Sequence, residues 1–165
     1  MLVLFGGPAG SGKSTLARAW CAPRPRAAHV ELDEVRRLIV SGLADPQEEG
    51  ALQAEQYELA VEASCGLARA FSAADYDVAL DDVLEPSAFD RYWRPRLDGL
   101  PWQLVVVLPS LEETLGRAGA RAKRVRQGHI RTQHARCLEW EEGVRVDTTG
   151  RDVEQSLALV RERLR

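Results

Sequence analysis

A glycine-rich segment near the start of the chain combines residue types and a spacing that suit phosphate binding. Residues 7–14 match the pattern G-x-x-x-x-G-K-[ST] at every fixed position, and a threonine follows. The residues concerned are Gly7, Pro8, Ala9, Gly10, Ser11, Gly12, Lys13, Ser14 and Thr15. Glycines allow the backbone to bend around phosphates, and the N-terminus of the following helix adds partial positive charge. Because Lys13 can reach the β- and γ-phosphates and the Ser14 hydroxyl can bind Mg²⁺, the segment predicts a nucleoside triphosphate site with Mg²⁺.

A carboxylate near the metal is the second requirement of this chemistry, and it usually follows a buried apolar strand. The longest apolar run, Gln103–Leu108, ends in a Pro-Ser pair and offers none. The run Val78–Leu80 instead leads directly into Asp81 and Asp82. We therefore expect one of these aspartates to act on Mg²⁺ or on the second substrate, and we assign Asp81 to the metal together with Ser14. A plain strand-end loop is the alternative interpretation.

The elements that must position these residues alternate along the chain. Five short apolar runs lie between longer helical segments, as in βαβ units around a parallel sheet, and their continuous hydrophobicity fits strands buried on both faces. The runs are Leu2–Phe5, His29–Leu32, Val78–Leu80, Gln103–Leu108 and Val144–Val146. Capping signals predict helices at Asp45–Phe71 and from Ser110, and apolar residues at helical spacing predict a third near Asp152–Leu164. One α/β domain accounts for residues 1–165.

The order of these motifs resembles that of the small P-loop kinases. The phosphate loop is followed by Asp33-Glu34-Val35-Arg36, Asp81-Asp82-Val83-Leu84, a basic segment and Val146-Asp147-Thr148-Thr149. This arrangement is most similar to chloramphenicol phosphotransferase-like proteins, and also resembles gluconate, shikimate, zeta-toxin and polynucleotide kinases. The resemblance implies a three-layer P-loop NTPase fold, with a five-stranded parallel sheet in the order 2-3-1-4-5, helices on both faces and a short basic lid.

The resemblance also implies roles for residues outside the phosphate loop. Asp33 would face the acceptor hydroxyl as a general base or orient it, with a plain helix cap as the alternative. Expected contacts to the acceptor come from Asp33, Arg36, Arg37, Asp81 and Asp82. The turn that contains Thr148 would pass close to adenine.

The segment Leu115–Leu138 contains no acidic residue. Its cations are Arg117, Arg121, Lys123, Arg124, Arg126, Arg131 and Arg136. A cluster of this kind repels itself unless an anion binds, and arginine suits phosphate because its planar fork is always charged. By similarity to adenylate and shikimate kinases we expect a lid over about residues 117–136, with Arg117 against adenine and Arg121 and Arg124 toward the phosphates. Arg121 would then take part in catalysis. A solvated basic helix face is the alternative.

Together these features predict an ATP- and Mg²⁺-dependent transfer of the γ-phosphoryl group to a hydroxyl of a small molecule, such as an antibiotic, sugar or nucleoside. One alternative is a kinase for a polynucleotide 5′-hydroxyl, which would need a basic groove. The region Asp45–Phe71 is acidic instead, with Glu48, Glu49, Glu55, Glu58 and Glu62. A second alternative is a nucleotide-gated regulatory NTPase.

Composition sets broad limits on partners and location. The 165 residues are 45% hydrophobic and 28% charged, values typical of a globular domain, and the net charge of −3 gives no global attraction to nucleic acid or anionic membranes. The three cysteines lack metal-binding or CxxC spacing, which favours reduced thiols. Without an apolar run of membrane-spanning length or a leader pattern, we expect a cytoplasmic protein with no membrane partner.

Overall fold

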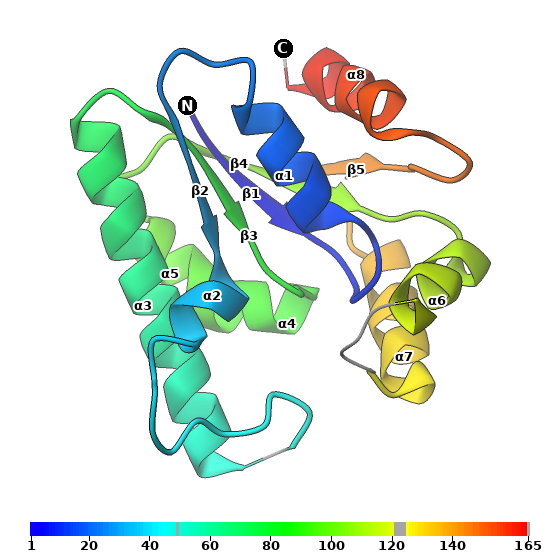
Figure 1. Ribbon diagram of the computed structural model, residues 1–165, viewed down its shortest axis with the longest axis horizontal. Helices are drawn as coiled ribbons and strands as arrows, with labels where there is room; N and C mark the ends of the chain where they lie inside the picture. Colours follow the sequence, from blue (N-terminus) through cyan, green and yellow to red (C-terminus); the bar gives the residue numbers. More distant parts are fainter. Residues whose placement is uncertain (49, 121–124, 165) are drawn as a thin grey trace.

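A parallel β-sheet forms the centre of the protein, as seen in a computed structural model that describes residues 1–48, 50–120 and 125–164. The strands run in the order β2-β3-β1-β4-β5. Their bounds are β1 Leu2–Gly6, β2 Ala27–Glu31, β3 Asp77–Asp81, β4 Trp102–Val107 and β5 Val144–Val146. The predicted sheet order 2-3-1-4-5 is therefore confirmed (Figure 1).

Helices cover both faces of this sheet and close its carboxyl edge (Figure 1). The helices are α1 Lys13–Cys21, α2 Leu32–Arg36, α3 Ala51–Ala73, α4 Pro86–Ala88, α5 Arg94–Leu97, α6 Leu111–Gly119, α7 Gln127–Leu138 and α8 Val153–Arg163. A π-helical turn at Phe89–Trp93 joins α4 to α5. None of the helices in these described ranges is both long and apolar enough to cross a membrane.

Alternating side chains divide the core into two layers. Residues such as Val3 and Ala79 pack against α1 and α8, and Trp20 of α1 is fully buried in this layer. Their neighbours Leu4 and Leu80 pack against α3 and the segment around Trp93. Successive side chains of a strand point to opposite faces of the sheet. Neighbouring side chains at the carboxyl end of a strand therefore also lie on opposite faces.

The predicted start of the long helix was wrong. Helix α3 begins at Ala51, after Gly50, and not at Asp45. Asp45 instead organises a turn, in which its Oδ1 accepts a hydrogen bond from the Gln47 N–H at 2.9 Å and its carbonyl accepts one from Glu48 at 3.1 Å. Asp45 and Pro46 therefore shape a connection at the edge of the site. The capping motif predicted at Ser110 is present, with the Ser110 side chain accepting from the Glu113 N–H. The structure also shows a full capping box at Asp152, which precedes α8.

Candidate active site

The phosphate loop connects β1 to α1, and its glycines lie where no other residue fits. Gly7 has a φ of 141°, and a Cβ there would lie 2.4 Å from the Val107 carbonyl oxygen. Gly10 has a φ of 87°, and a Cβ there would lie 2.4 Å from the Thr114 carbonyl oxygen. Both clashes involve backbone, so the loop depends on glycine for its bend and for its contact with neighbouring elements. Lys13 opens α1 and is buried.

Strand β3 brings a carboxylate to this loop. β3 pairs with β1, so that Asp81 lies opposite Phe5 at the carboxyl edge of the sheet. The Ser14 hydroxyl donates a hydrogen bond to Asp81 Oδ1 at 2.8 Å. A serine hydroxyl and a carboxylate are oxygen ligands of the kind that Mg²⁺ prefers. The two residues assigned to the metal from the sequence therefore lie side by side.

Asp81 and Asp82 have separate environments, because they project to opposite faces of the sheet. Asp82 lies on the α3 side, where its Oδ2 accepts hydrogen bonds from the Tyr57 hydroxyl and from Trp93 Nε1, the latter at 3.0 Å. Burial raises the pKa of Asp82 to about 7, against the opposing effects of these two donors and of the Lys13 charge. Burial and the Asp82 charge also raise the pKa of Tyr57.

One cleft of about 1170 Å³ joins the phosphate loop to this second face. At one end it is lined by Ala9, Gly10, Lys13 and Ser14. At the other end it is lined by Asp33, Arg36, Tyr57, Asp82 and Tyr92. The rings of Tyr57 and Tyr92 meet edge to face with centroids 5.1 Å apart. The cleft thus contains a phosphate-binding end, called the donor end below, and an aromatic, acidic end, called the acceptor end.

The two predicted acceptor arginines differ in position. Arg36 is buried and lines the cleft, where its Nη2 donates to the Ala44 carbonyl at 3.3 Å and its Nε has no hydrogen-bond partner in the described structure. Arg37 is exposed, forms an ion pair with Glu34, and lines a small side pocket instead. Arg36 is therefore available to a ligand in the cleft, whereas Arg37 lies outside it.

Helices α6 and α7 carry the predicted lid and lie against the phosphate loop (Figure 1). Gln133 of α7 accepts a hydrogen bond from the Ala9 N–H at 3.4 Å, and Arg117 of α6 donates to the Ser11 carbonyl at 3.3 Å. Arg121, Lys123 and Arg124 lie outside the described residues, so the expectations for them stay predictions.

The charge of the lid is more balanced than its sequence indicated. Although the segment itself lacks acids, Arg117 forms an ion pair with Glu113, and Arg136 pairs with Glu85 at 2.7 Å. Acids outside this segment, one of them on α6 itself, therefore compensate part of the positive charge, and the inference of an unbalanced cation cluster was wrong for these two arginines. The role of Arg117 at adenine stays a prediction.

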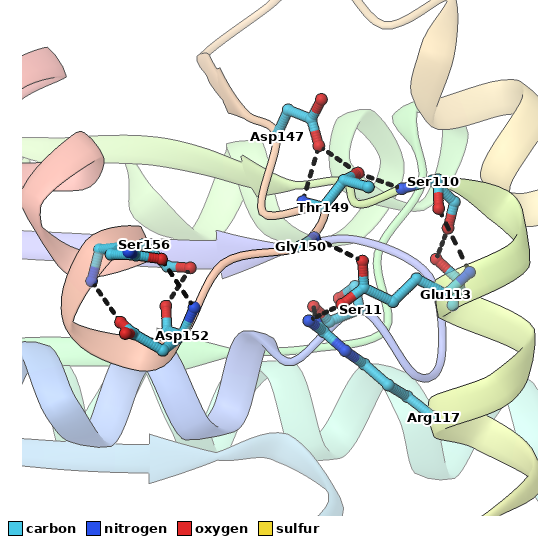
Figure 2. A network of polar contacts seen from close by, with 11 residues as sticks. Ser11, Ser110, Glu113, Arg117, Asp147, Thr149, Gly150, Asp152 and Ser156 are labelled. Carbon is cyan, nitrogen blue, oxygen red and sulfur yellow. Dashed lines mark hydrogen bonds and ion pairs between the residues drawn. The ribbon is translucent and has the colours of Figure 1, made fainter.

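A polar network joins the turn after β5 to α6 and the phosphate loop (Figure 2). Thr149 Oγ1 accepts from the Ser110 N–H at 2.7 Å, and Glu113 accepts from the Gly150 N–H at 2.9 Å while pairing with Arg117. The adjacent Thr148, expected near adenine, is buried, and its hydroxyl has no partner among the described residues.

Three residues of the site were not assigned from the sequence. Trp93 and Tyr57 both donate hydrogen bonds to Asp82. His29 of β2 contacts Asp81 Oδ2, on the carboxylate oxygen that Ser14 leaves open. The position of His29 could have been inferred from strand pairing. Glu31 lies directly opposite Asp81, and His29 is two residues before Glu31 on the same face of β2.

Solved structures with the same fold include proteins described as kinases. The tunicamycin resistance protein of Deinococcus radiodurans is 20% identical, with 99% of this chain and 94% of that one covered at a TM-score of 0.74. A sugar kinase from Janibacter sp. is 18% identical, with 99% and 93% covered and a TM-score of 0.72. A gluconokinase from Sinorhizobium meliloti is 16% identical, with 98% and 93% covered and a TM-score of 0.63. No curated protein sequence matches.

The family match concerns most of the chain. Residues 2–140 match the family described as an AAA domain, a span that contains the phosphate loop, Asp81, Asp82, and helices α6 and α7. The chain therefore belongs to this AAA domain family and has the fold of the small P-loop kinases that its sequence resembles.

Proposed function

We propose that this protein is an ATP- and Mg²⁺-dependent phosphotransferase that moves the γ-phosphoryl group to a hydroxyl of a small molecule. The observation that carries the proposal is the single cleft in which the phosphate loop faces a second, acidic and aromatic end. A protein that only binds and hydrolyses a nucleotide has no need of such an acceptor end. The kinase fold of the structural neighbours supports the same reaction class.

The residues of the donor end hold and neutralise the triphosphate. The backbone N–H groups of the phosphate loop and the Lys13 ammonium would bind the phosphate oxygens, and Ser14 and Asp81 would hold the metal. Mg²⁺, when bound, neutralises charge on the β- and γ-phosphates. Positioning and charge neutralisation provide most of the catalysis in reactions of this type.

Asp33 is the proposed proton acceptor at the other end of the cleft. The acceptor oxygen attacks the γ-phosphorus, the bond to the bridging oxygen breaks, ADP leaves, and the hydroxyl proton passes to the Asp33 carboxylate. Arg36, which lines the cleft beside Asp33, would orient the acceptor. Asp82, fixed by Tyr57 and Trp93, offers its remaining oxygen to a second polar group of the acceptor.

The size and lining of the cleft favour a small acceptor over a polynucleotide. Small-molecule sites usually occupy about 300–1,000 Å³, so a cleft of about 1170 Å³ suits a nucleotide together with a compact second substrate. Tyr57 and Tyr92 supply apolar surface for a ring or an aglycone. Glu58 and Glu62 of α3 share one cationic partner, Arg96, so this cluster keeps a net negative charge that would repel a nucleic-acid backbone.

Transfer from [γ-³²P]ATP to pools of antibiotics, sugars, nucleosides and 5′-hydroxyl oligonucleotides tests this proposal. We expect a labelled organic product from one small-molecule pool, and no product with Lys13→Ala. Label that appears only on oligonucleotides would establish the polynucleotide kinase. Label that appears only as inorganic phosphate, at a rate independent of every pool, would favour the regulatory NTPase.

A further inference from the structure

Three side chains on β2 and β3, those of His29, Glu31 and Asp81, lie close together at the edge of the sheet. Asp81 also accepts the hydrogen bond from Ser14. β2 pairs with β3 so that Glu31 lies opposite Asp81 and His29 lies opposite Ala79. Residues two apart in a strand share a face, so all three side chains project toward α1. One donor atom from each lies within 4.8 Å of the other two. The grouping therefore follows from strand register.

The charges around this group leave room for a cation. Asp81 is buried and Glu31 is only partly exposed. The pairing of β2 with β3 holds these two carboxylates opposite each other. Arg18 of α1 lies 4.0 Å from Glu31, but its side chain is 74% exposed. Such an exposed ion pair contributes little, and a bound cation would relieve the repulsion between the carboxylates.

We propose that His29, Glu31 and Asp81 form a binding site for a divalent transition-metal ion in the nucleotide-free protein. An imidazole nitrogen with two carboxylates suits Mn²⁺, Co²⁺ or Zn²⁺, whereas Mg²⁺ prefers oxygen ligands alone. The ion replaces the contact between His29 and Asp81 Oδ2. Asp81 Oδ1 stays hydrogen-bonded to Ser14, so the proposed ion uses the other oxygen of this carboxylate.

Mn²⁺ binding to the chelator-treated full chain, followed by electron paramagnetic resonance without nucleotide, tests the site. We expect one saturable ion that a tenfold excess of Mg²⁺ does not displace. His29→Gln should weaken binding at least about tenfold, since even outer-shell changes cost 10–100-fold in metal affinity. The matched control is His129→Gln, which removes a histidine of α7 that contacts Gln133 and should leave Mn²⁺ binding unchanged.

Three results would overturn the inference: no saturable Mn²⁺ binding, unchanged binding in His29→Gln, or an equal loss in His129→Gln. Thermal unfolding of each variant shows whether it is folded. If His29→Gln is not folded, Glu31→Gln replaces it, because Glu31 is more exposed and should show the same loss. Neither ATP nor an acceptor is present in the assay, so its outcome is independent of the proposed phosphotransfer.

Discussion

The donor end and the acceptor end of the cleft are built in different ways. The donor end is one continuous segment, residues 7–15, bent by glycines and braced by α6 and α7 through backbone contacts. The acceptor end takes single side chains from α2, α3, the end of β3 and the π-helical turn. A short motif is thus enough to specify phosphate binding, whereas the choice of acceptor depends on residues that only the fold brings together.

The largest loss of activity is expected at the donor end, from Lys13→Ala. This change removes the charge that reaches the triphosphate, and we expect transfer to fall by roughly 10³-fold, the upper range for loss of one preorganised donor, with weaker ATP binding. Calorimetric ATP titration and a transfer assay measure both effects. A folded variant with full ATP affinity and turnover would show that the segment is not the donor site.

At the acceptor end, Asp82 should make the stability of the folded protein depend on pH. Its pKa of about 7 is raised above the ordinary value of 3.8, so the folded state keeps the proton while the unfolded state loses it. Stability should therefore fall as pH rises from 5 to 8, by about 3 kcal/mol relative to Asp82→Asn.

Urea unfolding of wild type and Asp82→Asn at pH 5 and pH 8 checks this value. Asp98→Asn, at an exposed aspartate, serves as the control and should follow wild type. Parallel pH profiles for wild type and Asp82→Asn would mean that Asp82 stays ionised in its buried position.

A smaller effect at the donor end is expected from Arg117→Ala. The variant loses the contact with the Ser11 carbonyl and the pair with Glu113, and releases part of the network in Figure 2. We expect ATP affinity to fall about tenfold, the scale of one charge-assisted hydrogen bond. Arg131→Ala, at an exposed position of α7, should leave ATP affinity unchanged. Equal losses in both variants would indicate general electrostatics in place of a specific brace.

The contrast between the two ends also explains how much the sequence could predict. The strands and the phosphate loop follow from local patterns, since buried strands and glycine turns leave continuous signals. The sheet order instead came from the resemblance to the small P-loop kinases. The neighbourhood of Asp81 and Ser14 required only that β3 lie beside β1. The bonds from Trp93 and Tyr57 to Asp82 join residues 11 and 25 positions away, and no local pattern encodes them. The helix start predicted at Asp45 was wrong because an aspartate before a proline can begin either a turn or a helix.

The central claim is that a hydroxyl acceptor binds opposite the donor end and gives its proton to Asp33. ADP release measured with and without the active acceptor pool, for wild type and Asp33→Asn, tests it most directly. Asp33 is the second residue of α2, whose N-cap is Glu31, so the alternative of a plain helix cap was wrong. Asn has nearly the same shape as Asp, so the substitution mainly removes the charge. We predict that the acceptor raises ADP release by wild type, and that Asp33→Asn lowers this increment by roughly 10²-fold with ATP affinity nearly unchanged. The account would be contradicted if ADP release had the same rate with and without every pool, and if wild type and Asp33→Asn released ADP equally fast.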